Sequence, residues 1–309
     1  MIPAPASTSP APPGRVVVVA NPACGRHDPS ALDRLVAALR AAGVDAALAA
    51  PTSVTALEGL VRTTDADVIA VAGGDGTLHR AAAVLLGRPE PRPRLAVVPQ
   101  GTADVLAHEY ALPRDPDAIA GAILAGRTRP LRFGRLVDAN GTAHPFFLAA
   151  SVGLDAEVVH AVEGGPRRRF KKLAYARAAL ARASAPAPTI RVVATAPDGA
   201  RVEFDAALAI VAKARHYAGA HVLTRSTSMS EPGLRLLALR RADPLALLAA
   251  VTRLALGRLE ASANVVSLPV RTVRLAAGPP AAVQIDGEPA GRTPVEIEAI
   301  DAVIEVVVG

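Results

Sequence analysis

A glycine-rich segment, Gly73-Gly74-Asp75-Gly76-Thr77, constrains the fold of this chain more than any other part of its sequence. It follows the apolar run at residues 68–72 and precedes a stretch with helical spacing, which predicts a strand, a tight turn and a helix. Glycines let the backbone turn tightly and approach a ligand closely. Because the start of a helix presents unpaired N–H groups to phosphate, the segment predicts a nucleotide-binding turn.

Asp75 is the only acidic residue of this turn. A carboxylate beside phosphates repels them unless it binds Mg²⁺ or accepts a proton from a nucleophile. The turn therefore favours phosphoryl transfer over nucleotide binding alone. A glycine-rich connection in an ordinary α/β domain stays open as an alternative, since such motifs also occur without this function.

Length and composition limit the class of protein. The 309 residues predict two domains. Hydrophobic residues make up 51% of the chain and aromatic residues only 3%, so a stacking platform for nucleic acid is not expected. The formal net charge of +6 suits anionic partners, including nucleotides, nucleic acids and anionic lipid head groups, without choosing between them.

Three further features indicate where the protein works. Cys24 is the only cysteine, which excludes an internal disulfide and fits a reducing cytoplasm. Residues 1–13 contain five prolines and no signal-peptide pattern, so we expect a disordered arm. The apolar segment 244–256 is interrupted by Arg253 and is too short to span a bilayer. We therefore expect a soluble cytoplasmic protein that is at most peripheral, at the inner face of the membrane.

Residues 14–137 alternate between β-rich and helical runs, which is typical of a parallel sheet with crossover helices. Ligands of such sheets bind at the carboxyl ends of the strands. We therefore expect the loops at 21–25, 73–77 and 101–104 to converge on one crevice. The expected strands are 16–20, 44–49, 68–72 and 95–99, and the expected helices are 30–42, 54–63 and 77–86.

Residues 138–309 have a different pattern, with strand-like segments joined by turn dipeptides. These dipeptides are Asn140-Gly141, Asp198-Gly199 and Asp286-Gly287. Helices are expected at 170–183 and 244–259, and the closing strand 303–308 could pack on either domain. The sequence thus predicts an α/β protein, with a parallel-sheet nucleotide-binding domain before a mainly antiparallel, β-rich and sandwich-like domain.

Five short motifs follow one another along both halves. They are Asn21-Pro22-Ala23-Cys24-Gly25, Gly73-Gly74-Asp75-Gly76-Thr77, Pro99-Gln-Gly-Thr-Ala-Asp-Val-Leu-Ala107, Val152-Gly-Leu-Asp-Ala156 and Asp286-Gly287-Glu288. In this order they resemble the diacylglycerol kinase catalytic family, in particular its bacterial lipid-kinase branch, which is related to sphingosine kinases. The resemblance covers residues 15 to 309.

The resemblance implies an ATP-binding domain, a lipid-substrate domain and an active site in the cleft between them. Phosphate would pass from ATP to a lipid hydroxyl, with Glu288 as the general base and Asp75 as the catalytic Mg²⁺ contact. The residues implied to surround ATP are Asn21, Pro22, Ala23, Cys24, Gly25, Arg26, Thr52, Gly73, Gly74, Asp75, Gly76, Thr77, Leu78, His79, Arg80, Gly101 and Thr102.

Several positions depart from the family pattern. Cys24 replaces a serine, and Asp104 stands where asparagine is usual, so we expect its carboxylate to face a backbone amide or a cation. His79 and Arg80 stand where Asn and Glu are common; Arg80 could meet a phosphate or lie on a helix surface. Each departure affects a loop or helix of the implied ATP site.

A further departure concerns the segment from Ser228 to Leu234. Relatives carry an Asp-Asp-Gly-Leu-like loop there, in which the acid before glycine helps to bind a structural Mg²⁺. Here that position is Pro232, and the nearest acid, Glu231, is one residue away. We therefore do not expect the second metal site.

The densest positive charge lies at residues 167–172, continued by Arg177 and Arg182. It could dock the protein on an anionic membrane or form a solvated helix face. Nucleic acid is not an expected partner, because neither a recognition helix nor stacking aromatic residues are apparent. A homodimer is left open, through a strand edge or through the helix at 244–256.

The predicted function is an ATP-dependent lipid kinase with a diacylglycerol-like or sphingoid-like acceptor. NAD kinase is the nearest alternative enzyme, since it shares the Gly-Gly-Asp-Gly-Thr turn and the two-domain plan. A nucleotide- or lipid-binding protein that has lost catalysis is a third possibility, given the altered loop at Pro232 and the residues Cys24, His79 and Arg80.

Overall fold

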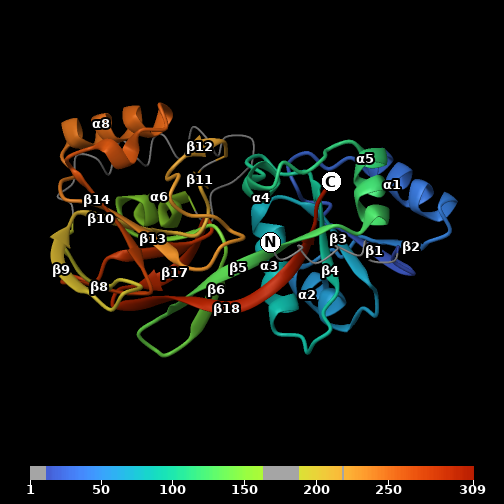
Figure 1. The fold of residues 1–309 in the computed structure, drawn as a ribbon, viewed down its shortest axis with the longest axis horizontal. Helices are drawn as coiled ribbons and strands as arrows, with labels where there is room; N and C mark the ends of the chain where they lie inside the picture. The colour runs from blue at the N-terminus through green and yellow to red at the C-terminus, as the bar shows by residue number, and fades with distance from the viewer. Residues whose placement is uncertain (1–11, 163–187, 218) are drawn as a thin grey trace, which may run out of the picture. The chain divides into compact units, whose positions relative to one another are not determined.

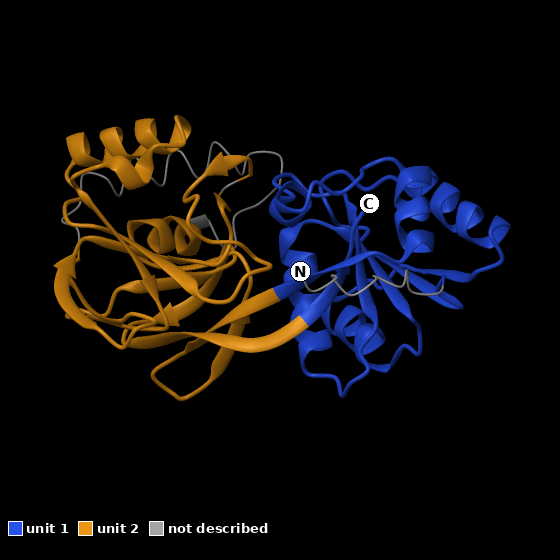
Figure 2. Cartoon of the chain, in the orientation of Figure 1, with its two compact units in different colours: residues 1–131, 304–309 blue, residues 132–303 orange. Residues whose placement is uncertain are grey.

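The computed structural model describes residues 12–162, 188–217 and 219–309 (Figure 1). The contacts divide the chain into two compact units, residues 1–131 with 304–309 and residues 132–303 (Figure 2). We call them unit 1 and unit 2. The basic segment 167–172 with Arg177 and Arg182, the helix expected at 170–183 and residues 1–11 of the expected arm lie outside the described residues.

Unit 1 is built on a parallel sheet in the order β2-β1-β3-β4. The apolar run of β3 is buried along its whole length, as expected of a strand with both sheet faces covered. The predicted parallel sheet is therefore confirmed. Its strands are β1 (Arg15–Ala20), β2 (Asp45–Ala49), β3 (Val68–Gly73) and β4 (Arg94–Pro99).

Helices α1 (Pro29–Ala41), α2 (Val54–Thr63) and α3 (Asp75–Leu86) connect these strands, and α4 (Val105–Glu109) and α5 (Pro116–Ala125) follow β4. Side chains cap three of them, because Asp28, Ser53 and Asp115 each accept a hydrogen bond from a first-turn amide. Helices α1 and α5 contact each other and share one core with the sheet, whereas α2 and α3 lie on its other side (Figure 1). Neither α4 nor α5 was predicted from the sequence.

Unit 2 is a sandwich of antiparallel strands. One sheet has the order β14-β13-β10-β7-β16-β17, and the other contains the run β18-β15-β8-β9. Aliphatic side chains from both sheets form one core between them. This arrangement confirms the predicted β-rich, sandwich-like fold.

The elements of unit 2 and its connections to unit 1 are β5 (Thr128–Val137), β6 (Ala143–Phe146), β7 (Ala149–Gly153), α6 (Leu154–Val162), β8 (Ile190–Thr195), β9 (Arg201–Ala206), β10 (Leu208–Ala212), β11 (His216–Tyr217), β12 (His221–Val222), β13 (Leu234–Leu239), α8 (Pro244–Ala255), the 3₁₀ helix η2 (Leu259–Ala261), β14 (Val265–Val270), β15 (Thr272–Ala277), β16 (Ala282–Ile285), β17 (Glu288–Arg292) and β18 (Val295–Val307).

The three predicted turn dipeptides all form turns, between β5 and β6, between β8 and β9 and between β16 and β17. Their glycines have positive φ angles, which is the conformation that selects glycine in such turns. The helix expected at 244–259 ends earlier, at Ala255, because Gly257 has φ 64° and breaks it before η2.

The closing strand is longer than the expected segment 303–308. β18 has 13 residues, pairs with β15 near its start, and pairs with β4 in parallel at Val306. Its final residues group with unit 1. In the part of the chain that the structure describes, no helix combines the length and the apolar character needed to cross a bilayer.

Candidate active site

The glycine turn lies between β3 and α3. Gly74 is the N-cap residue of α3, and no side chain caps this helix end. The amide of Thr77 donates to the carbonyl of Gly74 at 2.9 Å, and the amides that precede it at the helix start are the groups from which an anion can accept hydrogen bonds. The start of α3 therefore fits a phosphate group, as the sequence predicts.

The first loop is joined to this turn by Asn21. Its side-chain Nδ2 donates to Oγ1 of Thr77 at 2.8 Å, and its backbone N–H donates to the carbonyl of Ala72 at 2.9 Å. Its Oδ1 accepts from the amide of Ala23 at 3.0 Å. Asn21 thus fixes both the shape of the first loop and its position beside α3.

The third loop packs against the glycine turn through backbone. The amide of Gln100 donates to the carbonyl of Gly73 at 3.1 Å. A Cβ atom on Gly74 would lie 3.0 Å from Cα of Gly101, and one on Gly101 would overlap with Cα of Gly74. Both positions therefore require glycine because two backbones meet there.

The first and third loops also contact each other. The amide of Arg26 donates to the carbonyl of Gln100 at 3.1 Å, and Sγ of Cys24 lies 3.6 Å from Oε1 of Gln100. A Cβ on Gly25 would lie 3.4 Å from Oγ1 of Thr102. The structure thus brings together the three loops that were expected to converge at the carboxyl ends of the strands.

Asp75 holds the third loop in place. Its Oδ1 accepts a hydrogen bond at 2.8 Å from the amide of Val105, the first residue of α4. The carboxylate therefore lies beside the uncapped start of α3, where phosphate and Mg²⁺ would meet. Mg²⁺ is commonly bound by one or two carboxylates together with phosphate oxygens, so a single carboxylate fits this role.

Asp104 is buried, with 2% of its side chain exposed. Its Oδ1 accepts from the amide of Gly101 at 2.8 Å, and its Oδ2 pairs with Nη1 of Arg114 at 3.1 Å. The backbone of Asp104 has a positive φ of 48°, which Asp and Asn adopt more readily than other residues. The expectation that this carboxylate faces an amide or a cation is confirmed on both counts, and Arg114 is a partner that the sequence did not reveal.

Other residues of the predicted ATP set have different surroundings. Arg80 lies 3.7 Å from Glu58, so it links α3 to α2, as a helix-surface arginine does. The side chain of Leu78 is buried in the core and can meet a ligand only through its backbone. Thr52 is exposed in the loop after β2, and no hydrogen bond joins its side chain to the three loops within the described residues.

In unit 2, Asp286 fixes the turn that precedes Glu288. Its buried carboxylate accepts hydrogen bonds from three consecutive backbone amides, those of Phe147 at 3.0 Å, Leu148 at 2.9 Å and Ala149 at 3.0 Å. The sequence identified Asp286 as a turn residue and as part of the Asp-Gly-Glu motif but did not reveal this role. Glu288 follows as the first, partly buried residue of β17.

A chain of polar contacts through Gln284 also supports the turn at Asp286-Gly287. The amide of Gly287 donates to Oε1 of Gln284 at 2.8 Å. Nε2 of Gln284 donates to Oγ of Ser151 at 2.8 Å and to Oδ2 of Asp155 at 3.0 Å. Asp155 also accepts from the hydroxyls of Ser151 and Tyr217. The fourth motif, which contains Asp155, therefore positions the fifth, which contains Glu288.

The loop from Ser228 to Leu234, for which the family resemblance implied a structural Mg²⁺, contains a different cation here. Nζ of Lys213 donates to the carbonyls of Ser228 at 2.8 Å and Gly233 at 3.1 Å, and also to that of Glu231. The ammonium is buried and already occupies the point on which these carbonyls converge. With Pro232 in place of the acid, these residues do not fit a metal ion.

Burial, and to a smaller extent the positive charge of Arg132, lowers the pKa of Lys213 to about 8, while Glu231 opposes the shift. The side chain is still mainly protonated at neutral pH, which gives three N–H donors for three carbonyls. The sequence contains one signal for this arrangement, a lysine directly after an otherwise apolar strand, and that signal was overlooked.

Family models match both halves of the chain. Residues 15–136 match the diacylglycerol kinase catalytic domain, and residues 149–308 match the YegS C-terminal NAD kinase beta sandwich-like domain. These ranges contain the three loops and the Asp286–Glu288 turn, respectively.

Named relatives align over shorter stretches. A diacylglycerol kinase of Mycobacterium tuberculosis is 37% identical over 93 residues, which cover 30% of this chain and 29% of the relative. A protein of Stenotrophomonas maltophilia, provisionally named a YegS-like lipid kinase, is 38% identical over 114 residues, covering 35% of this chain and 36% of its own. The chain thus matches about a third of the length of these relatives.

Solved structures show the same fold over most of the chain. A protein of Bacillus anthracis, provisionally assigned as a diacylglycerol kinase, has a TM-score of 0.76 at 21% identity and covers 97% of this chain and 98% of its own. Yeast NADH kinase is less similar, with a TM-score of 0.53 at 13% identity over 96% of this chain and 84% of its own. Together with the two matching models, the fold shows that this chain belongs to the diacylglycerol kinase family of lipid kinases, with a catalytic domain followed by a YegS-type β-sandwich domain.

Proposed function

We propose that this protein is an ATP-dependent lipid kinase, which transfers the γ-phosphate of ATP to the hydroxyl of a diacylglycerol-like or sphingoid-like lipid. The observation that carries the proposal is the joining of three loops beside the uncapped start of α3. Family membership supports it, since the catalytic-domain model is that of diacylglycerol kinases.

The nucleotide would be held mainly by backbone. The amides at the start of α3 would bind its phosphates, together with the first and third loops that carry Arg26 and Thr102. Asp75 would hold Mg²⁺, which neutralises phosphate charge when it is bound. Because Val105 is hydrogen-bonded to the same carboxylate, Asp75 would also keep the third loop next to the phosphates.

Glu288 would act as the general base. Its carboxylate would accept the proton of the lipid hydroxyl while the hydroxyl oxygen attacks the γ-phosphorus and ADP leaves. Asp286 and Gln284 would be positioning residues, since they fix the turn before Glu288 through backbone amides. This function would place the protein in lipid metabolism, including phospholipid biosynthesis, working from the cytoplasm at the inner face of the membrane.

Phosphate transfer from labelled ATP with Mg²⁺ to a bacterial lipid extract tests the proposal, with NAD as a parallel acceptor. We expect a labelled lipid with the wild type and a loss of about a thousandfold or more in rate for Glu288→Gln, because a general base contributes about 10²–10⁴-fold. Glu296→Gln, which changes an exposed acid on β18, is the matched control and should retain the wild-type rate.

Each other outcome has a definite meaning. Label on NAD alone would replace the proposal with NAD kinase, whose fold the chain shares at low identity. ATP binding without transfer to any acceptor would favour a binding protein that has lost catalysis. Full lipid transfer by Glu288→Gln would remove Glu288 from the role of general base.

A further inference from the structure

Helix α8 exposes large apolar side chains on its outer face, which we define as Leu245, Leu248, Val251 and Leu256. Their exposed fractions are 77%, 64%, 63% and 66%. Among the other described residues, no large hydrophobic side chain exceeds the 49% of Val54. A soluble surface helix normally turns such residues towards the core, so this face indicates an interaction surface.

The direction of this outer face is set by the packing of the opposite side. Ala250 and Leu254 pack against the core on one side of the six-stranded sheet. Thr252 is the polar residue within the outer face, and its hydroxyl donates to the carbonyl of Leu248 at 2.8 Å, inside the helix. The outer face therefore presents apolar surface with its polar group already satisfied.

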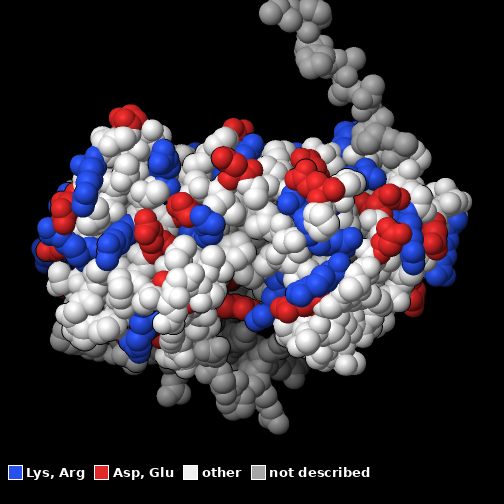
Figure 3. All heavy atoms as spheres, turned by 90° about the horizontal axis from the view of Figure 1, so that it is seen from below, with Lys and Arg blue, Asp and Glu red and all other residues white. Residues whose placement is uncertain are grey.

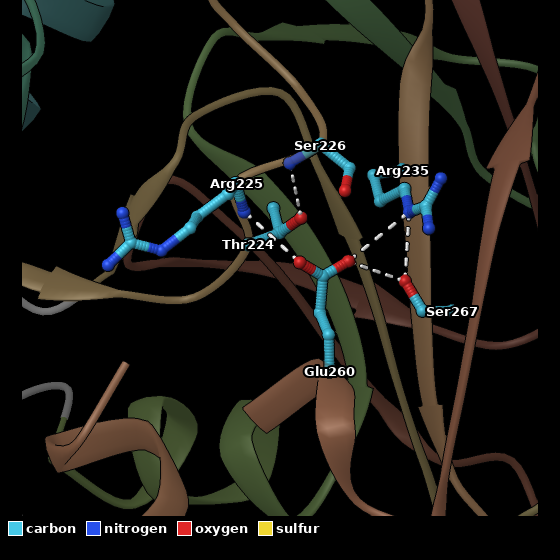
Figure 4. A network of polar contacts seen from close by, with 6 residues as sticks. All are labelled: Thr224, Arg225, Ser226, Arg235, Glu260 and Ser267. Carbon is cyan, nitrogen blue, oxygen red and sulfur yellow. Dashed lines mark hydrogen bonds and ion pairs between the residues drawn. The ribbon is translucent and has the colours of Figure 1, made fainter. Parts of the chain in front are cut away.

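Polar contacts hold both ends of α8. At the start, Asp243 accepts from the amide of Ala246 at 3.1 Å. After the end, Glu260 of η2 accepts from the amide of Arg225 at 3.1 Å and from Oγ of Ser267 at 2.7 Å, and lies 3.4 Å from Nε of Arg235 (Figure 4). The Asp243 contact thus caps the helix, and the Glu260 contacts hold the η2 segment that follows it.

Arginines precede α8, lie within it and follow it. Arg240, Arg253 and Arg258 are exposed, and within the described residues none of them forms an ion pair, whereas Arg241 pairs with Asp243 at 2.8 Å. The face of the molecule in Figure 3 differs, because there basic and acidic residues are interspersed. An apolar helix face with unpaired basic residues beside it complements an anionic bilayer surface.

A second copy of the chain fits this surface less well. A two-fold contact through α8 would bring together two surfaces that are each net positive, since Arg240, Arg241, Arg253 and Arg258 outnumber Asp243 and Glu260 around the helix. Lipid head groups of opposite charge would attract these arginines instead. The charge pattern therefore favours a lipid surface over a homodimer.

We propose that α8 is an interfacial helix that inserts its outer face into an anionic lipid bilayer surface. This inference rests on the proposed function, because a lipid acceptor resides in a membrane. It adds a docking surface within the described part of unit 2, separate from the basic segment at 167–172 that the sequence suggested for this purpose.

Co-sedimentation of the full chain with vesicles tests the inference. The vesicles contain phosphatidylcholine alone or mixed with phosphatidylglycerol. We expect Leu245→Gln/Leu248→Gln/Val251→Gln to weaken binding to the mixed vesicles about tenfold or more, because three apolar insertions are lost. The control Val54→Gln/Val202→Gln changes exposed apolar residues elsewhere and should bind like the wild type. Arg253→Gln/Arg258→Gln should weaken binding only to the mixed vesicles.

Two further measurements separate this inference from the proposed function. On a short-chain lipid acceptor dissolved without vesicles, the triple variant should keep the wild-type rate, as it should keep the wild-type circular dichroism. The wild type could fail to phosphorylate any lipid and still bind the mixed vesicles more strongly than the triple variant does. In that case the docking inference stands while the kinase proposal fails. Unchanged vesicle binding by the triple variant would overturn the inference. A wild-type dimer in light scattering that the triple variant dissociates would overturn it in favour of a homodimer.

Discussion

The two units hold their candidate site residues in different ways. In unit 1, three loops are joined by the side chains of Asn21, Asp75 and Asp104 and also directly through backbone, where glycine allows the close approach of residues 74 and 101. In unit 2, buried charged side chains hold loops together, as Asp286 does through three amides and Lys213 through three carbonyls. Unit 1 thus depends also on the absence of side chains at specific points, and unit 2 on the presence of a few buried charges.

Removal of Asp286 should have the largest effect on stability. Asp286→Ala would leave three buried or partly buried amides without their acceptor, and we expect the free energy of unfolding to fall by about 4 kcal/mol. Asp198→Ala is the matched control in another hairpin turn, where the carboxylate accepts from one exposed amide at 3.0 Å. Its loss should cost less than about 1 kcal/mol in urea denaturation. Equal losses for the two variants would contradict the buried role of Asp286.

Removal of the Lys213 ammonium should cause the second largest loss of stability. Lys213→Met keeps the length of the side chain but removes the donor for three carbonyls, so we expect a loss of about 3 kcal/mol. Arg215→Met, which removes an exposed donor to the carbonyl of Thr227 in the same loop, should cost less than about 1 kcal/mol. A chelator should leave the wild-type melting temperature unchanged. A fall on chelation would show that a metal ion, and not the ammonium, stabilises this loop.

The pH dependence of stability gives a second test of the buried ammonium of Lys213. The pKa of Lys213 is about 8 in the folded protein and 10.5 for an ordinary lysine. Between these values the unfolded chain binds more protons than the folded one, so the contribution of Lys213 to the free energy of unfolding rises with pH. We therefore expect the stability difference between wild type and Lys213→Met to increase from pH 8 to 10.5, measured by denaturation at several pH values. A constant difference would contradict the lowered pKa.

A side chain at Gly101 tests the backbone contact of unit 1. In Gly101→Ala the added Cβ would overlap with Cα of Gly74, and we expect a loss of about 2 kcal/mol with an ATP affinity about tenfold lower. Gly121→Ala is the matched control, because a Cβ there meets no atom within 4 Å and lies in α5. It should stabilise the protein by about 0.5 kcal/mol. Unchanged ATP affinity in Gly101→Ala, measured by calorimetry, would contradict the prediction that the third loop contributes to ATP binding.

The smallest effect is expected at Arg80. Its partner Glu58 is 3.7 Å away and both side chains are about a third exposed, so Arg80→Gln should cost less than about 0.5 kcal/mol and leave ATP affinity within about twofold. A loss of affinity much larger than this would mean that Arg80 contacts a phosphate, which is the alternative that the sequence left open.

Much of the fold follows from local sequence patterns. The strands of unit 1 are apolar runs of strand length, and the three turn dipeptides mark hairpins because their glycines adopt positive φ angles. Helix α5 was not predicted, although Asp115 and Pro116 form a typical helix start. The end of α8 was misplaced because Gly257 interrupts an apolar pattern that continues beyond it.

The candidate site was predictable in unit 1 and less so in unit 2. Glycine loops at strand ends are visible in the sequence because the topology of a parallel sheet brings strand ends together. For Asp104, the sequence predicted the chemical type of the partner, an amide or a cation, but not that the partners are Gly101 and Arg114. Gln284 gave no distinctive local pattern, and the position of Lys213 directly after the apolar strand β10 did not name the carbonyls that it binds, so neither role was predicted.

The sequence by itself determined the four parallel strands and the first three helices of unit 1, the hairpin turns of unit 2 and the motifs of the family, because each depends on residues close together in the chain. Only the tertiary structure decided which buried polar groups meet. Asp286 binds amides up to 139 positions away, and Lys213 binds carbonyls 15 to 20 positions away. Such partners are chosen by distance in space and by the cost of burying an unpaired polar group, and neither can be read from neighbouring residues.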